Sequence, residues 1–440
     1  MRFWALTLAC LCAMLPSDGS AQAKASSPSS RNADTQEATL KYVVYLSRHG
    51  VRSPTGKASQ YNVYSTGLWP DWPVQPGYLT PRGFHLMEQF GAFDRMQLAT
   101  QGLLQPDGCA DASRLTIYAD SDERTRETGK AMAQGLMPGC NVPVESLPEG
   151  VNDPLFHRIT ASNPIDPDLA KAAIAGRIGG DSANLTQAYH QEIAALDQIL
   201  ATCGTAPSSQ AKRFSLFDIP ATLSAGTGDH LADLKGPLNT ASTLSENLLL
   251  EYAEGMDDAS VGWGCVHHAE IQALMALHTA ATDFTQRTPE IARAQASSLL
   301  GSIRLSIQQA ADHKAIHGAM SKPSDRALFL IGHDTNQENI AGLLNLTWII
   351  DGRLDDTPPG GALIFELWQN SATRQYSVWT YFTAQTLEQM RSSTPLTASN
   401  PPERVPVFIP ACSEADMSCT LDSFLHLLKQ ESDRRDVVQK

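Results

Sequence analysis

The chain carries at residues 42–54 the sequence Tyr42-Val43-Val44-Tyr45-Leu46-Ser47-Arg48-His49-Gly50-Val51-Arg52-Ser53-Pro54. Its first five residues are apolar and β-prone, which predicts a strand buried on both faces, as in a parallel sheet. The polar residues that follow form a loop at the carboxyl end of this strand, where open α/β sheets bind ligands. Gly50 allows a ligand to approach the backbone closely, and Pro54 fixes the exit of the loop. A structural strand end with solvated arginines is the alternative, but this long polar stretch is more specific than a single Arg-His pair.

Two further apolar strands are each followed by polar residues. The predicted strand Leu115–Ala119 runs into Asp120-Ser121-Asp122-Glu123-Arg124-Thr125-Arg126, whose acidic residues favour a helix start. The predicted strand Ala327–Ile331 runs into Gly332-His333-Asp334-Thr335-Asn336. The carboxyl ends of neighbouring parallel strands share one edge of a sheet. We therefore expect one cluster of side chains at that edge: Arg48, His49, Arg52, Arg124, His333 and Asp334.

Each of these later side chains also has a purely structural interpretation. Arg124 and its neighbour Arg126 can pair with glutamates along their own helix. Asp334 is well suited to be a helix N-cap. His333 can be a buried, hydrogen-bonded histidine. Their placement directly after predicted strands is what favours a functional role.

The residue types of the cluster suit phosphoryl transfer. The three arginines would neutralise phosphate oxygens, with His333 as a further donor. Neutral His49 would attack phosphorus in line and form a phosphohistidine. Asp334, held protonated, would pass its proton to the leaving alcohol, and water would hydrolyse the intermediate. Because the arginines supply the positive charge, we expect neither a metal nor another cofactor.

The rest of the chain predicts an α/β protein with an insertion. Long helical patterns dominate the middle of the chain, over Asn184–Leu200, Ala241–Gly255 and Ala269–Phe284. The α/β pattern then resumes and includes a hairpin of the strands Ala362–Trp368 and Tyr376–Phe382. We therefore predict an α/β domain of residues 24–158 and 285–440, with a mainly helical domain of residues 159–284 inserted into it.

The net charge limits the kinds of partner that the chain can bind, and the amino terminus indicates where the protein is located. The 440 residues carry a net charge of −14, which argues against nucleic acid, although a local arginine cluster can still bind a small phosphate ester. Residues 1–23 have the pattern of a signal peptide: a basic start, the apolar run Phe3–Leu15, and the cleavage site Ser20-Ala21-Gln22-Ala23. We expect a periplasmic or secreted monomer that has no membrane contact after cleavage.

Six cysteines remain after cleavage, and an even number in an exported protein suggests disulfides. The pairs Cys412/Cys419 and Cys109/Cys140 are the preferred assignments, which leaves Cys203 with Cys265, although the sequence does not fix the connectivity. A metal site is the weaker interpretation, because Cys-x-x-Cys does not occur and two histidines next to Cys265 form only a weak cluster.

The combination of Arg48–Pro54 with His333-Asp334 resembles the histidine acid phosphatases, and within them most of all the bacterial periplasmic phytases, with the glucose-1-phosphatases as close relatives. The resemblance covers nearly the whole mature chain. It includes the stretches Trp69–Val74, Leu79–Gly83, Asp120–Arg126, Asp153–Phe156, Gly262–Gly264, Arg287–Glu290, Thr357–Gly361 and Gln385–Leu387.

The resemblance implies a fold and a set of roles. The fold would be a phosphoglycerate-mutase-like three-layer α/β domain, with the α domain closing over the cleft. His49 would be the nucleophile and Asp334 the proton donor, while Arg48, Arg52, Arg124 and His333 would bind phosphate. Thr55, Asp120 and Glu246 match positions that line the substrate pocket in phytases; their structural alternatives are a loop hydroxyl, a helix-start acid and a solvated helix face. The pairs Cys109–Cys140 and Cys412–Cys419 also match the family pattern, whereas Cys203 and Cys265 do not both have clear counterparts.

Two departures from the phytases concern substrate choice. Phytases place a lysine directly after the threonine of the opening loop, whereas this chain has Gly56 there and Lys57 one step later. A second basic residue, after Arg293, is replaced by Gln295. The two missing or shifted cations should weaken the grip on a polyphosphorylated inositol ring but leave the catalytic pocket intact, so the phosphatase activity is better supported than the choice of phytate. From the motifs together we expect an acid phosphomonoesterase that is a phytase, with a sugar-phosphate phosphatase like glucose-1-phosphatase as the alternative. A non-catalytic phosphate-binding protein is a further alternative, which the presence of His49 and Asp334 disfavours.

Overall fold

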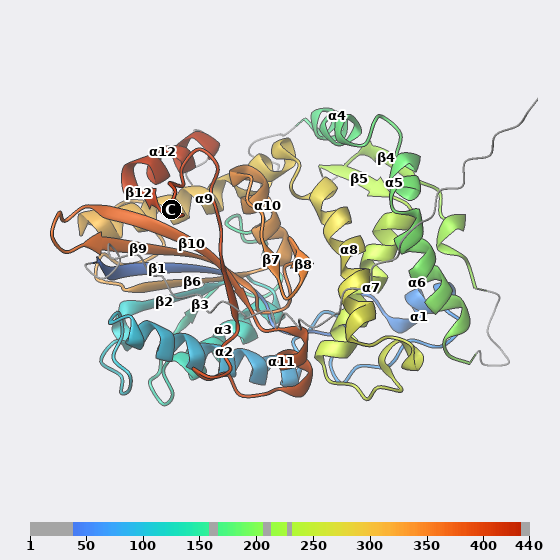
Figure 1. The fold of residues 1–440 in the computed structure, drawn as a ribbon, viewed down its shortest axis with the longest axis horizontal. Coiled ribbons are helices and arrows are strands. Elements are labelled where there is room, and N and C mark those ends of the chain that lie inside the picture. Colours follow the sequence, from blue (N-terminus) through green and yellow to red (C-terminus); the bar gives the residue numbers. More distant parts are fainter. Residues whose placement is uncertain (1–37, 158–165, 206–212, 227–230, 433–440) are drawn as a thin grey trace, which may run out of the picture. The chain divides into compact units, whose positions relative to one another are not determined.

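The computed structural model describes residues 38–157, 166–205, 213–226 and 231–432 (Figure 1). The predicted signal peptide lies outside these residues. Eight strands form one sheet in the order β11-β10-β9-β1-β6-β2-β3, with β12 beside β10. Its strands are β1 (Ala38–Arg48), β2 (Leu115–Ala119), β3 (Val144–Glu145), β6 (Ala327–Gly332), β9 (Ala362–Asn370), β10 (Tyr376–Ala384), β11 (Glu403–Pro406) and β12 (Cys419–Thr420).

The three strands predicted to carry the polar loops are neighbours. β6 is parallel to both β1 and β2, and the register places Arg48 opposite Gly332 and Ala119 opposite Ile331. The carboxyl ends of β1, β6 and β2 are therefore level, and the three polar segments leave the sheet at one edge. β9 pairs antiparallel with the other side of β1, and β9 and β10 form the predicted hairpin.

Helices cover both faces of the sheet, as Figure 1 shows for α2 and α3 on one face and α9 and α12 on the other. Successive residues of a strand point to opposite faces. Tyr42, Val44 and Leu46 accordingly join the core under α9, α10 and α12, whereas Val43 and Tyr45 join the core under α2 and α3. The layers are helix, sheet and helix, as the predicted three-layer fold requires. The helices of these layers are α2 (Pro81–Thr100), α3 (Glu123–Leu136), α9 (Pro289–Asp312), α10 (Asp334–Leu344) and α12 (Leu421–Glu431).

The start of α2 supports the loop that follows β1. The hydroxyl of Thr80 accepts a hydrogen bond from the amide of Gly83 and caps the helix, with Pro81 as its first residue. A Cβ atom on Gly83 would lie 2.0 Å from the carbonyl oxygen of Val51, so only glycine permits this approach. The helix thus packs directly against the backbone that follows His49.

The middle of the chain is mainly helical. Its hydrophobic core is centred on α7, which is buried along most of its length, and also includes Leu387 and Met390 from α11 (Leu387–Ser392). The predicted helix Asn184–Leu200 is wrong in one respect, because it divides near Tyr189 into two helices. The boundaries predicted for the inserted domain stay a prediction. The helices are α4 (Pro167–Arg177), α5 (Ala183–Ala188), α6 (His190–Thr202), α7 (Pro237–Ala253) and α8 (His268–Thr285).

Short elements complete the chain. The hairpin of β4 and β5 lies within the mainly helical region, where sequence patterns gave no strand. None of the helices in the described residues is both long and apolar enough to cross a membrane. The remaining elements are α1 (Ala58–Tyr61), β4 (Thr222–Ala225), β5 (Ala232–Lys235), β7 (Ile349–Ile350), β8 (Arg353–Leu354) and the 3₁₀ turns η2 (Asn62–Tyr64), η3 (Ala112–Arg114), η4 (Leu216–Asp218) and η5 (Val261–Gly264).

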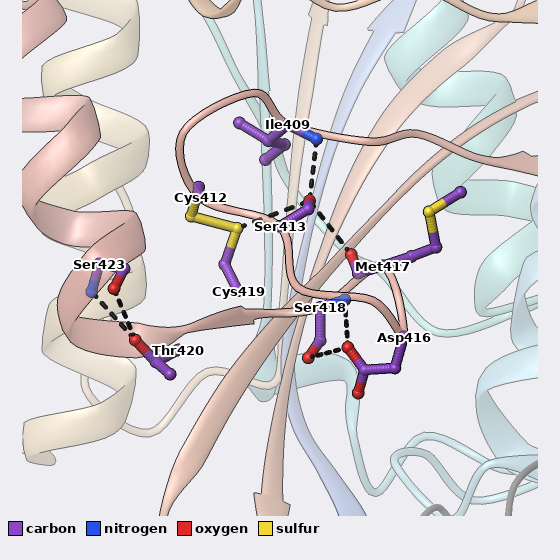
Figure 2. Close-up of a disulfide and its surroundings, with 9 residues drawn as sticks. All are labelled: Ile409, Cys412, Ser413, Asp416, Met417, Ser418, Cys419, Thr420 and Ser423. Carbon is purple, nitrogen blue, oxygen red and sulfur yellow. Dashed lines mark hydrogen bonds between the residues drawn. A yellow bond between two sulfur atoms is a disulfide. The ribbon is translucent and has the colours of Figure 1, made fainter.

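The structure pairs all six cysteines that follow the predicted cleavage site, as Cys109–Cys140, Cys203–Cys265 and Cys412–Cys419. The two preferred pairs are confirmed, and Cys203–Cys265 is the pair that they leave. Figure 2 shows Cys412–Cys419 closing the turn that leads into β12 and α12, where the Ser413 hydroxyl accepts from the Ile409 amide at 2.9 Å. This disulfide fixes the last helix to the edge of the sheet.

Candidate active site

His49 lies one residue beyond β1 and is held by its backbone. Its amide donates to the carbonyl of Gly332 at 3.0 Å, and its carbonyl accepts from the amide of Gly360 at 2.9 Å. Its Nδ1 lies 2.8 Å from the carbonyl oxygen of Gly50. A carbonyl oxygen only accepts, so Nδ1 carries the proton and Nε2 keeps its lone pair. This tautomer is the one that a nucleophilic histidine needs.

Burial and positive charge keep the His49 ring neutral. The side chain is buried, and burial is the largest cause that lowers the pKa of His49 well below its usual value. The charges of Arg124, Arg48 and Arg52 lower this pKa further. Burial and the three arginines therefore both favour the neutral form of His49.

Arg48 is fully buried between two carboxylates. Its guanidinium donates to the carbonyl oxygen of Thr357 at 2.6 Å and to Oε1 of Glu246, and it lies 3.1 Å from Oδ2 of Asp334. Burial alone would lower the pKa of Arg48, but Asp334 and Glu246 raise it. Arg48 is thus a permanent cation whose position is fixed from the sheet edge, from α7 and from α10.

Arg52 is the less firmly paired arginine. It lies 3.7 Å from Oε1 of Glu246 and donates to the carbonyl oxygen of Ser53 at 3.1 Å. Burial and the nearby arginines lower the pKa of Arg52 to about 10, although Glu246 opposes this. Glu246 is buried on α7, so its alternative interpretation as part of a solvated helix face is wrong.

The third arginine belongs to a network around His333. Arg124 pairs with Asp122 at 2.7 Å and lies 3.4 Å from Nδ1 of His333. The two histidine rings of the site, His49 and His333, meet edge to face with centroids 5.5 Å apart. The predicted cluster of His49, Arg124 and His333 is therefore brought together by the structure.

Asp120 requires a correction. We expected it to line the substrate pocket, but its side chain has no exposed surface. Its Oδ2 accepts from Nε2 of His333 at 2.7 Å and from Nε2 of His157 at 2.6 Å. Burial would raise the pKa of Asp120, but these two histidines lower it below its usual range. Asp120 is thus an ionised, buried acceptor that orients His333.

Asp334 requires a second correction. We expected the free site to hold it protonated. Burial does raise the pKa of Asp334, but the positive charges of Arg48 and His278 outweigh burial and hold it well below the usual range. The carboxylate is therefore ionised in the free site. The helix cap is His333, with Asp334 as the first residue of α10, so the N-cap interpretation of Asp334 is wrong as well.

Thr55 is the one predicted site residue that the structure leaves at the surface. It is exposed, and no hydrogen bond fixes its side chain among the described residues. It lies beside Gly77, where an added Cβ would be 3.7 Å from both the Thr55 Cγ2 and an Arg124 nitrogen. Thr55 is thus at the rim of the cluster.

Two histidines of the site were missed from the sequence. His157 follows Asp153–Phe156, and burial would lower its pKa, but its hydrogen bond to Asp120 raises it. Its position directly after a stretch quoted for the family resemblance was an available signal. His278 lies within an apolar part of α8, and no local pattern marks it. Its partners come from α7 and α10.

Four residues could in principle hold a metal ion: the ligand atoms of Asp120, Asp122, His157 and His333 lie within 4.8 Å of one another. Both histidine Nε2 atoms are already within hydrogen-bond distance of one oxygen of Asp120, and Arg124 pairs with Asp122. The donor set is therefore satisfied as a network of hydrogen bonds and ion pairs.

The arrangement offers positive charge and unused donors to an anion. The Nε atoms of Arg48, Arg52 and Arg124 are buried and have no hydrogen-bond partner among the described residues. Buried donors of this kind are costly unless they are satisfied. A phosphate group beside Nε2 of His49 would meet three guanidiniums, with Asp334 on the side of α10.

The chain is similar over most of its length to proteins that are already known. Residues 39–383 match the model of a family described as the histidine phosphatase superfamily (branch 2). The chain is 35% identical to phytase AppA of Escherichia coli over 90% of this chain and 92% of that protein. It is 28% identical to glucose-1-phosphatase of Salmonella typhimurium over 88% of this chain and 91% of that protein. The solved structure of Hafnia alvei phytase in complex with myo-inositol hexakis sulphate has a TM-score of 0.81 at 35% identity, and the match covers 92% of this chain and 99% of that chain.

Proposed function

Because this chain belongs to the histidine phosphatase superfamily (branch 2) and is a phosphoric monoester hydrolase, we propose that it is an exported phytase that works through a phosphohistidine on His49. The observation that carries this proposal is the free Nε2 of His49 inside a cluster of three arginines. Its proton is fixed on Nδ1 by the carbonyl of Gly50, at 2.8 Å. A neutral imidazole among fixed cations suits attack on the phosphorus of an anionic ester.

In the first step, the arginines bind the non-bridging oxygens of the phosphate, and Nε2 of His49 forms a bond to phosphorus as the bond to the leaving oxygen breaks. Arg124 turns from Nδ1 of His333 to the phosphate. Nδ1 of His333 can then donate a hydrogen bond to a phosphate oxygen. His333 keeps its orientation through Asp120, 2.7 Å from its Nε2.

The leaving oxygen takes a proton from Asp334. The phosphate dianion offsets the charges of Arg48 and Arg52, and these charges are part of what keeps Asp334 ionised in the free site. Substrate binding therefore raises the proton affinity of Asp334. In the second step, Asp334 takes a proton from the water that attacks phosphorus, and His49 is released.

The choice of phytate rests on the relatives and on the space beside the site. A cavity of about 480 Å³ borders the loop after Arg52 and is lined by Ser53, Lys57, Trp69 and Trp72 among others. This volume can take the inositol ring, with Lys57 near its outer phosphates. A lysine at Gly56, where phytases have one, would require the side chain of Tyr61 to shift, because a Cβ atom there would lie 2.4 Å from the Tyr61 hydroxyl.

The second candidate is a sugar-phosphate phosphatase, favoured by the shifted lysine and by Gln295 in α9. Export rests on residues 1–23 and is supported by three disulfides, which persist in oxidising compartments. Both proposals concern the surroundings of one catalytic cluster, so substrate comparison separates them.

The test combines a variant with a comparison of substrates. We expect His49→Ala to lose all turnover of p-nitrophenyl phosphate while keeping its thermal unfolding midpoint, and the wild type to form an acid-labile phosphohistidine with labelled substrate. His85→Ala, on the exposed side of α2, is the matched control. Full activity of His49→Ala would refute the mechanism. A higher kcat/KM for glucose-1-phosphate than for phytate would favour the second candidate.

A further inference from the structure

His278 is a buried histidine beside the two carboxylates of the site, and the steps above do not use it. Its residue is 9% exposed. Its Nε2 lies 3.8 Å from Oδ2 of Asp334 and 3.9 Å from Oε2 of Glu246. Neither Nε2 of His278 nor Oε2 of Glu246 has a hydrogen-bond partner among the described residues. Buried polar atoms are nearly always hydrogen-bonded, so two unpaired ones that face each other call for an explanation.

The other ring nitrogen of His278, Nδ1, faces a hydroxyl group that can pair with it whether or not it is protonated. Nδ1 lies 3.2 Å from the hydroxyl oxygen of Ser242, on α7. A serine hydroxyl can donate or accept, so it pairs with Nδ1 whether or not Nδ1 carries a proton. The ring can therefore gain or lose a proton without leaving Nδ1 unpaired.

Two anionic side chains face His278: Glu246 from α7 and Asp334 from α10. Arg48 and Arg52 contact these carboxylates from the side of β1. The elements α4, α6 and β8 also pack against α8, but within the described part of the chain no ion pair joins them to His278. A proton gained by His278 would therefore act on Glu246 and Asp334.

Asp334 lacks the proton that it must donate, and His278 is placed to supply it. Asp334 must deliver a proton to the leaving oxygen, yet in the free site it is an ionised carboxylate held by Arg48. Its Oδ2 is the oxygen nearest to Nε2 of His278. A closure of about 1 Å would bring these two atoms within hydrogen-bond distance.

We propose that His278 is the proton reservoir of Asp334 in this reaction, an inference that rests on the proposed function. When phosphate binds, the N–H bond at Nε2 of His278 breaks and an O–H bond forms at Oδ2 of Asp334. This proton then passes to the leaving oxygen as the ester bond breaks. In the second step Asp334 takes a proton from the attacking water and returns it to Nε2 of His278, so the cycle is balanced. His278 acts through Asp334 and is a positioning residue.

The alternative is that His278 is only a fixed positive charge near Asp334. The two roles predict opposite shifts. If His278 supplies the proton, its loss removes the reservoir, and the alkaline limb of the pH profile moves to lower pH. If His278 is only a charge, its loss lets Asp334 hold its proton more tightly, and the alkaline limb moves to higher pH.

The experiment measures kcat and kcat/KM between pH 3 and pH 8 for His278→Gln on two esters. 2-Glycerophosphate has an alkoxide leaving group that needs a proton, whereas p-nitrophenolate leaves without one. We expect the loss in kcat on 2-glycerophosphate to exceed the loss on p-nitrophenyl phosphate by about tenfold. The alkaline limb on 2-glycerophosphate should move to lower pH. In an Asp334→Asn background, His278→Gln should add no further loss.

The matched control is His268→Gln, a histidine of the same helix that packs against Tyr252. Equal losses on the two esters, or an alkaline limb at higher pH, would overturn the proposal. If His278→Gln does not fold, His278→Asn takes its place. If neither folds, Ser242→Ala is used, which keeps the imidazole but removes the partner of Nδ1. It should give a smaller loss that is still selective for 2-glycerophosphate, and no selectivity there would also overturn the proposal. A wild type that is inactive on both esters would refute the proposed function instead.

Discussion

His49, Asp120 and Asp334 show how individual charges are set by their neighbours. Burial shifts the pKa of all three side chains, and neighbouring charges either oppose or reinforce that shift. For His49, burial and the arginines act together and keep the ring neutral. For both aspartates, positive neighbours outweigh burial and keep the carboxylates ionised. The residue types alone did not indicate this, and it is the reason why the predicted protonated Asp334 is wrong for the free site.

The charge of Arg124 should set the acid limit of activity. Arg124 is the second largest cause, after burial, that lowers the pKa of His49. In Arg124→Met this pKa should rise, so the acid limb of kcat/KM on p-nitrophenyl phosphate should move to higher pH. The rate itself should fall about 100-fold. Arg124→Lys keeps the charge and should keep the acid limb of the wild type. Identical limbs in the two variants would contradict this account.

Asp120 should stabilise the protein within a limited pH window. Because the pKa of Asp120 is lower in the folded protein, its full contribution to the free energy of unfolding is present above its pKa in the unfolded chain, about 3.9. This contribution is lost as the pH falls below that value. The raised pKa of His157 makes the contribution of that partner complete below about 6.5 and lost as the pH rises. Asp120→Asn should therefore lower the free energy of unfolding most between pH 4 and 6.5, by about 3 kcal/mol. Urea unfolding at pH 3, 5 and 8 measures this; an equal cost at all three values would count against the ion pair.

The sequence predicted the strands and helices near the site well, because their ends carry clear signals. The strand Leu115–Ala119 has the predicted bounds. The division between α5 and α6 could not be predicted, since Leu185, Tyr189 and Ile193 continue one helical spacing through it. His278 could not be predicted for another reason: its role depends on α10, which lies more than fifty residues later in the chain.

The disulfides should differ in their contribution to stability according to the segment that each closes. Cys203–Cys265 closes 62 residues, Cys109–Cys140 closes 31 and Cys412–Cys419 closes 7. Chain entropy gives about 4 kcal/mol for the longest and about 2.5 kcal/mol for the shortest. Replacing each pair by serine should lower the free energy of unfolding in that order, as measured with urea. A larger loss from the short loop of Figure 2 than from Cys203–Cys265 would show that strain or local packing dominates.

The net charge of the whole molecule acts on substrates before they reach the site. The chain carries −14 at pH 7, and its isoelectric point is about 5.3, so the net charge becomes positive at more acidic pH. Long-range repulsion of a polyanion at pH 7 therefore gives way to attraction at pH 4.5. Salt screens both effects.

This reversal predicts the salt dependence of catalysis. Raising the ionic strength should lower kcat/KM for phytate more steeply at pH 4.5 than at pH 7, because only at pH 4.5 does it screen an attraction by the whole molecule. p-Nitrophenyl phosphate, with one phosphate group, is the control and should show a smaller difference between the two pH values. Equal salt slopes for phytate at both pH values would mean that the arginine cluster alone governs association.

The position of β1 in the sheet also has a consequence for biosynthesis. The strand that leads to His49 is flanked by β6 and β9, which end at Gly332 and Asn370. A ribosome thus completes both neighbours of this strand only after it has translated Asn370, more than 300 residues beyond Arg48. Until then the nascent polypeptide has no assembled catalytic centre and cannot consume the phosphate esters of the cell that makes it.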